Sequence, residues 1–135
     1  MKTIEHIRDF IDGFVAWASA QADVHAVALV GSYARAATHD NSDIDLVLLT
    51  DQPEKYLADI TWAERFGTVE RHKIEDYSKL TSLRVWYRDG HEVEYGLTTP
   101  DWIAPPLDPG TKRVIDDGML VLFERSALLS PILKN

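Results

Sequence analysis

The sequence predicts an α/β domain in which a mixed sheet of about four to six strands packs against helices lying mainly on one side. Apolar residues near the N-terminus recur at helical spacing, whereas several later segments are continuously apolar or alternate as strands do. The chain has 135 residues, and 45% of them are hydrophobic. That is enough for one core but too little for a second large domain, so we expect residues 1–135 to form a single domain.

Residues 3–21 are predicted to form an amphipathic helix that begins near Thr3, a suitable N-cap. The apolar positions recur at steps of three and four residues, and they are Ile4, Ile7, Ile11, Phe14, Val15 and Ala18. We interpret this stripe as core packing, with an interface to a partner as the alternative. Residues 24–30 then form an apolar run that predicts a buried strand, with His25 in a structural role.

The stretch from Gly31 to Leu49 carries the main chemical signal. A second strand is predicted to end near Leu49, with Asp43 and Asp45 at its start. Residues two apart in a strand point to the same side, so these carboxylates share a face. Two adjacent carboxylates repel each other unless a cation lies between them, and hard oxygen ligands of this kind suit Mg²⁺.

A short helix is expected to begin at Ser32, directly after Gly31. The free backbone N–H groups of a helix start, together with the Ser32 hydroxyl, suit a phosphate group. Arg35 lies one turn further on, where it can either face a phosphate or pair with an acid. Residues 38–42 are predicted to form a polar loop.

The aspartates have two other interpretations, a turn and a calcium loop. Asn-Ser-Asp is ordinary turn chemistry, and an isolated Asp-x-Asp is more often structural than functional. A calcium loop over residues 40–45 fails because Ile44 would occupy a ligand position and no glycine follows at the required turn. The Gly31-Ser32 step before the aspartates therefore favours a functional site for phosphate and a metal ion.

The remaining elements follow from local signals. A helix is predicted to start near Pro53 and to continue through Ala63, and a strand is favoured over residues 68–76. Residues 82–98 are expected to form a hairpin with its turn at Asp89-Gly90. The later predictions are a turn or short helix from Thr99, a helix over 110–117, a strand over 119–123 and a terminal helix over 126–133.

Composition excludes several classes of protein. The net charge is −8, with 22 acidic and 14 basic residues, which argues against a broad nucleic-acid groove. The chain has no cysteine and therefore neither a disulfide framework nor a thiolate metal site. No apolar run approaches the length needed to span a membrane, and the acidic N-terminus does not resemble a signal peptide. We expect a soluble cytoplasmic protein, with an oligomer as an open possibility.

Gly-Ser, ten residues and then Asp-x-Asp resemble the signature of the DNA polymerase beta-like nucleotidyltransferase superfamily. The segments Gly31–Arg35 and Ser42–Leu46 are similar to those of its small bacterial members, the minimal nucleotidyltransferases (MNT type). Ala36 departs from this pattern, because many relatives have glycine there. The resemblance implies the nucleotidyltransferase fold, which supplies the strand order, and a third metal-binding carboxylate on a later strand.

Glu94 is our choice for that carboxylate, because it is farther from the hairpin turn than Glu92 and has apolar neighbours. The hairpin register decides the sheet face of Arg84: a three-residue loop places it beside Glu94, and a two-residue loop places it on the opposite face. In the first case it could reach a triphosphate. Trp102 is interpreted as core, with stacking on a base as the alternative.

The resemblance implies a Mg²⁺-dependent enzyme that moves an NMP group from an NTP, with ATP favoured, to an acceptor hydroxyl. Asp43, Asp45 and Glu94 would be catalytic and would hold two Mg²⁺ ions, whereas Gly31, Ser32 and Arg35 would bind the nucleotide. It also implies a small helical partner protein of the HEPN type, as in toxin–antitoxin pairs. An antitoxin-like or regulatory nucleotide-binding module is the alternative function, and a metal hydrolase is disfavoured because no suitable His-Asp cluster is present.

Overall fold

The computed structural model describes residues 4–31, 43–77, 79–126, 128–129 and 131. Its elements are α1 (Ile4–Ser19), β1 (Val24–Val30), β2 (Ile44–Thr50), α2 (Pro53–Ala58), the 3₁₀ helix η1 (Thr61–Phe66), β3 (Val69–Asp76), β4 (Leu80–Tyr87), β5 (Glu92–Thr98), the 3₁₀ helix η2 (Pro100–Ile103), α3 (Pro109–Asp117) and β6 (Met119–Glu124). The predicted helix at 32–37 and loop at 38–42 lie outside the described residues, as do residues 127, 130, 132 and 133 of the predicted terminal helix. Residues 126, 128 and 129 of that segment are described and are not helical.

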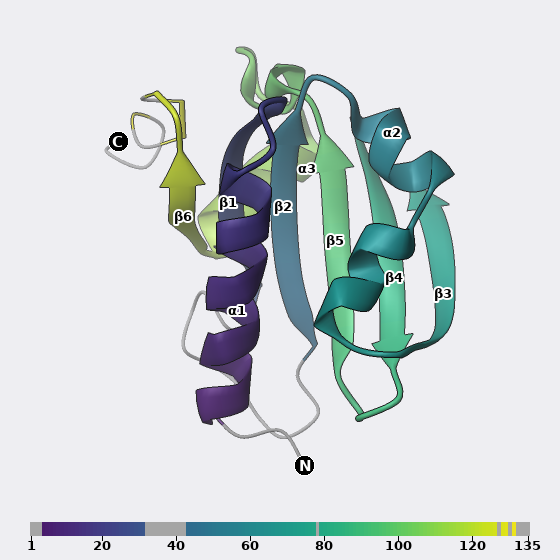
Figure 1. The fold of residues 1–135 in the computed structure, drawn as a ribbon. Coiled ribbons are helices and arrows are strands. Elements are labelled where there is room, and N and C mark those ends of the chain that lie inside the picture. Colours follow the sequence, from purple (N-terminus) through teal and green to yellow (C-terminus); the bar gives the residue numbers. More distant parts are fainter. Residues whose placement is uncertain (1–3, 32–42, 78, 127, 130, 132–135) are drawn as a thin grey trace.

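Six strands form one mixed sheet in the order β3-β4-β5-β2-β1-β6 (Figure 1). β2 and β5 run parallel, whereas the other neighbouring pairs are antiparallel. The parallel pair lies in the middle of the sheet, where both faces are covered, as parallel strands require. The predicted mixed sheet is therefore confirmed.

Helices cover the two faces unequally. α1, α2 and η1 lie on one face of the sheet, and α3 lies behind the other (Figure 1). Along β2 the side chains alternate: Ile44, Leu46 and Leu48 belong to the core under α1, whereas Val47 and Leu49 belong to a second core with Trp102. Asp45 follows the alternation of Val47, so it lies on the α3 face.

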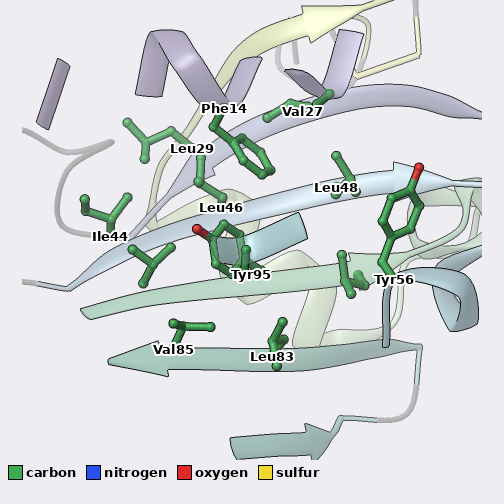
Figure 2. Close-up of a cluster of buried hydrophobic side chains, with 14 of the residues drawn as sticks. Phe14, Val27, Leu29, Ile44, Leu46, Leu48, Tyr56, Leu83, Val85 and Tyr95 are labelled. Atoms are coloured by element: carbon green, nitrogen blue, oxygen red, sulfur yellow. The ribbon is translucent and has the colours of Figure 1, made fainter. Parts of the chain in front are cut away.

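The core under α1 contains many aromatic rings. Phe14 is fully buried and its ring lies 5.4 Å from that of Tyr95. Figure 2 shows both side chains in this core. The rings of Trp17 and Trp62 stack in parallel at 5.2 Å and fix η1 against α1. The predicted apolar stripe of the first helix therefore packs in the core, as its periodicity indicated.

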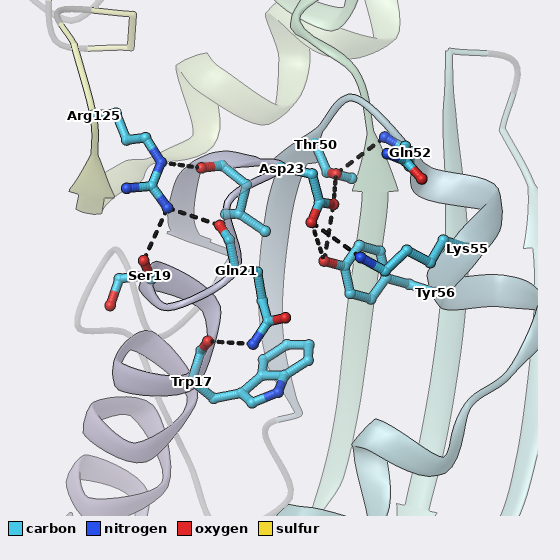
Figure 3. Close-up of polar contacts among 10 residues, drawn as sticks. Trp17, Ser19, Gln21, Asp23, Thr50, Gln52, Lys55, Tyr56 and Arg125 are labelled. Carbon is cyan, nitrogen blue, oxygen red and sulfur yellow. Dashed lines mark hydrogen bonds and ion pairs between the residues drawn. The ribbon is translucent and has the colours of Figure 1, made fainter.

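A polar cluster closes the end of the sheet at which β1 begins and β2 ends (Figure 3). The carboxylate of Asp23 accepts hydrogen bonds from the Thr50 hydroxyl at 2.6 Å, the Tyr56 hydroxyl at 2.9 Å and the Lys55 ammonium at 3.1 Å. These contacts join the start of β1 to the end of β2 and to α2. The Arg125 guanidinium donates to the carbonyl oxygens of Ser19, Gln21 and Val24, which ties β6 to the end of α1.

The helix predicted to continue through Ala63 is interrupted. α2 ends at Ala58, Asp59 is extended, and η1 begins at Thr61. The Asp59 carboxylate accepts the N–H of Thr61 at 3.0 Å, a local bond that competes with helical pairing. The prediction of one continuous helix was therefore wrong, because the sequence pattern did not account for this turn.

Candidate active site

Three neighbouring strands place charged residues in one row. Asp45 on β2 is the register partner of Glu94 on β5, and Glu94 is the register partner of Arg84 on β4. Register partners lie side by side on the same sheet face, so the three side chains occupy the α3 face together. Asp43 immediately precedes β2 and has its carboxylate on the same guanidinium.

The hairpin register is the one that a three-residue loop requires. The N–H of Tyr87 bonds the carbonyl oxygen of His91 at 2.8 Å, which leaves residues 88–90 as the loop, and Gly90 has a φ of 101°. This geometry settles the alternative that the sequence had left open, and it places Arg84 beside Glu94.

Gly31 closely approaches the carboxylate of Asp45. Its φ is 75°, a conformation that side-chain-bearing residues rarely adopt. A Cβ atom built at this position would lie 2.4 Å from Oδ2 of Asp45. The glycine that the sequence pattern singled out is therefore required both by the backbone conformation and by the contact with the first strand-borne carboxylate.

The surroundings of Asp45 disfavour its ionised form. Burial, the negative charges of Asp43 and Glu94, and a hydrogen bond with Asp43 together raise its pKa to about 8, although the charge of Arg84 works in the opposite direction. Its Oδ1 atom is buried and has no hydrogen-bond partner. A carboxylate in this position would be stabilised by an additional cation.

Arg84 partly supplies that positive charge. Its Nη1 atom donates to Oδ2 of Asp43 at 3.1 Å and also bonds Oε2 of Glu92, while Nη2 donates to Oε2 of Glu94 at 3.0 Å. Partial burial works to lower the pKa of the guanidinium, but the hydrogen bonds and charges of the three carboxylates raise it overall. Arg84 therefore stays charged. It contacts the carboxylates of Asp43, Glu92 and Glu94 but not that of Asp45.

A cavity of about 340 Å³ adjoins these residues on the same face. Asp45, Arg84 and Glu94 form one wall, and Trp102 with Val47 contributes an apolar wall. Trp102 is only 3% exposed, so it packs in the core as the sequence favoured, while its ring also lines the cavity. Gly96 and Leu80 also line the cavity and pack closely, since a Cβ atom at Gly96 would lie 2.9 Å from Leu80.

The structure brings together Asp43, Asp45 and Glu94, with Gly31 against Asp45, and adds Glu92 and Arg84 to the group. Ser32 and Arg35 lie outside the described residues. Among the described residues, no three acidic or histidine side chains are arranged to hold a metal ion, so the metal-binding role stays a prediction.

Ser82 was missed by the sequence analysis. Its hydroxyl donates to Oε2 of Glu94 at 2.7 Å and thereby orients that carboxylate. The strand alternation that places Arg84 and Ser82 on one face could have revealed it, but only once the hairpin register was known.

Among the described helices, none is long and apolar enough to cross a membrane.

Comparison with solved structures identifies the fold. An aminoglycoside 6-adenyltransferase from Bacillus subtilis superposes with a TM-score of 0.64 at 14% identity, over 94% of this chain and 43% of that one. Cid1 bound to the UTP analogue UMPNPP gives a TM-score of 0.51 at 16% identity, over 69% of this chain and 30% of that one. The chain thus spans less than half the length of these structures, which support the predicted nucleotidyltransferase fold.

No curated protein sequence matches the chain. A family model described as streptomycin adenylyltransferase matches residues 1–111, a range that contains α1, the Asp43–Asp45 pair and the β4–β5 hairpin. The predicted membership of the polymerase beta-like superfamily is confirmed at this level, while the minimal subtype stays a prediction. The chain belongs to the streptomycin adenylyltransferase family.

Proposed function

We propose that this protein transfers a nucleoside monophosphate from an NTP, with ATP favoured, to an acceptor hydroxyl. The observation that carries the proposal is the β2–β5 register, which sets Asp45 beside Glu94 on one face with Asp43 next to them. The family match to adenylyltransferases supports the same chemistry. The paired acids and the close approach of Gly31 are the features that we assign to the reaction.

The carboxylates fit divalent metal ions by their chemistry. Asp45 has a buried oxygen without a partner and a raised pKa, and its neighbours add only hard oxygen donors. We propose that Asp43, Asp45 and Glu94 hold two Mg²⁺ ions. Such ions, when bound, would neutralise phosphate charge and lower the pKa of the attacking hydroxyl.

The chain's own residues then position and deprotonate the reactants. The acceptor oxygen forms a bond to the α-phosphorus while the bond to the pyrophosphate oxygen breaks, and pyrophosphate leaves. Asp45 or Glu94, when ionised, takes the proton of the acceptor hydroxyl. Because Gly31 has no side chain, its backbone lies close to Asp45, and we assign phosphate binding to Gly31 together with Ser32 and Arg35.

The acceptor is a separate part of the proposal. The cavity of about 340 Å³ is at the low end for ligand pockets, so it admits a compact group and not a large molecule in full. We propose that this group is a hydroxyl-bearing part of a larger acceptor, and that the acceptor is a helical partner protein of the HEPN type. Streptomycin, the compound named in the family description, is the acceptor to test against it.

A label-transfer assay tests the proposal. The purified protein is incubated with Mg²⁺, each α-labelled NTP in turn, and either cell extract or streptomycin. Transfer is expected with ATP and lost in an Asp43→Asn variant, while Glu70→Gln, which removes an exposed carboxylate on β3, is expected to keep it. Label on a protein band supports a protein acceptor, label on streptomycin replaces it with the small molecule, and no transfer with any nucleotide contradicts the proposed reaction.

A further inference from the structure

The guanidinium of Arg84 occupies the position where the acidic residues converge. It reaches Asp43 at 3.1 Å and Glu94 at 3.0 Å, and its third carboxylate partner is Glu92. The side chain is only 23% exposed, so this is a partly desolvated cluster and not a surface ion pair. Charge-assisted hydrogen bonds of this kind are among the stronger hydrogen bonds in proteins.

One guanidinium does not balance the cluster. Asp43, Asp45, Glu92 and Glu94 could together carry four negative charges, and Arg84 contributes a single positive charge. The Oδ1 atom of Asp45 stays without a partner. The cluster therefore has room, in charge and in hydrogen bonding, for a cation that approaches from the side of Asp45.

Arg84 and a metal ion would compete for the same atoms. The guanidinium uses Oδ2 of Asp43 and Oε2 of Glu94, and Ser82 already donates to that second oxygen. A divalent ion binds carboxylate oxygens at about 2.0–2.6 Å. Oε2 of Glu94 already accepts two hydrogen bonds, so an ion bound to that oxygen would take a lone pair that Arg84 or Ser82 uses, and its positive charge would repel the guanidinium. Binding of the ion at these oxygens is therefore expected to loosen the contacts of Arg84 with Asp43 and Glu94.

We propose that Arg84 is a displaceable counterion: it holds the carboxylates together without metal, gives up Asp43 and Glu94 when a divalent cation binds, and then contacts the NTP phosphates. Glu92 keeps its ion pair with Arg84 during this exchange and so holds the guanidinium beside the site. In this scheme Arg84 is a phosphate-binding residue, and Glu92, which acts through Arg84, is a positioning residue. The inference rests on the proposed function, since it concerns the same carboxylates.

The test measures binding without catalysis. Titration of the full chain with Mn²⁺ in the absence of nucleotide is compared for wild type, Arg84→Gln and Arg65→Gln, the last of which removes an exposed arginine on η1. We expect Arg84→Gln to bind Mn²⁺ about tenfold more tightly, the scale of a typical coupling between two ligands. Arg65→Gln should bind as wild type does.

A second readout has the opposite sign. At saturating Mn²⁺, Arg84→Gln and Glu92→Gln should each bind ATP about tenfold more weakly than wild type, within the usual range of coupling. A residue that only supports the fold would weaken both ligands together. Arg84→Lys, which keeps the charge but not the fork of donors, should fall between wild type and Arg84→Gln for Mn²⁺ and provides a test if the glutamine variant does not fold.

Unchanged or weaker Mn²⁺ binding in folded Arg84→Gln, or in Arg84→Lys if the former does not fold, would overturn the inference even if wild type transfers nucleotides. Tighter Mn²⁺ binding together with weaker ATP binding would support it even if no acceptor is labelled. The binding experiment and the transfer assay can therefore fail independently.

Discussion

Replacing Asp45 with asparagine should stabilise the metal-free protein at neutral pH, although it removes a carboxylate that we assign to catalysis. Burial and the neighbouring charges of Asp43 and Glu94 raise the pKa of Asp45 from 3.8 to about 8. In the unfolded chain the same carboxyl ionises near its ordinary value. Between these two values, the folded protein retains a proton that the unfolded chain has released.

The sign and size of the effect follow from this proton. When folding raises the pKa of a carboxyl in this way, the free energy of unfolding has its full value below about pH 3.8 and decreases as pH rises toward 8. Each pH unit lowers the free energy of unfolding by about 1.4 kcal/mol, so wild type loses roughly 4 kcal/mol by pH 7. Asparagine does not ionise, and we expect Asp45→Asn to recover about 2–4 kcal/mol at pH 7.

Urea unfolding in EDTA, followed by far-ultraviolet circular dichroism at several pH values from 4 to 8.5, measures this difference. The gain of Asp45→Asn over wild type should be small at pH 4 and should increase up to about pH 8. Glu70→Gln, which removes an exposed carboxylate, is the matched control and should follow wild type. Added Mg²⁺ should stabilise wild type and have less effect on Asp45→Asn, because the ion binds the folded carboxylate.

Two results would refute this reasoning. One is an Asp45→Asn variant that is less stable than wild type at pH 7.5 in EDTA. The other is a stability difference that does not change between pH 5 and pH 8, because the argument requires a proton that the folded and unfolded states bind differently.

Three further variants test other parts of the structure. Gly31→Ala should lose about 1–3 kcal/mol of stability in thermal unfolding and most activity, because a Cβ atom would meet Asp45. Gly13→Ala in α1 is the control and should gain about 0.5–1 kcal/mol. Equal effects of the two substitutions would contradict this. Tyr87→Phe removes the buried hydrogen bonds of the Tyr87 hydroxyl with the Ala63 carbonyl oxygen and the Tyr95 hydroxyl and should lose about 1–3 kcal/mol in urea unfolding; no loss would show that these bonds are dispensable. Partial burial opposes ionisation of Asp23, but its hydrogen bonds lower its pKa overall. Asp23→Asn should therefore lose about 1–3 kcal/mol of stability at pH 7, and this difference should disappear as pH falls below 3.8. A difference that stays constant with pH would exclude a link between the ionisation of Asp23 and folding.

The site could be predicted in part because its strongest signals are local. Gly31 and the Asp43–Asp45 pair stand in one short stretch, and the strand period of two puts both aspartates on one face without any tertiary information. The stripe of α1 predicted its buried face in the same way, since Phe14 and Ala18 are fully buried. The network around Arg84 was not predictable, since it joins residues from three strands.

The sequence by itself determined the types and approximate limits of most described elements, the shared face of Asp43 and Asp45, and the Gly31-Ser32 step before them; the need for glycine at position 31 came from the structure. The tertiary structure decided what meets on that face. The parallel pairing of β2 with β5 set Glu94 beside Asp45, and the three-residue hairpin loop set Arg84 beside Glu94. Periodicity depends on neighbours along the chain, whereas register depends on strand pairing, and a shift of one residue would have turned Arg84 to the opposite face.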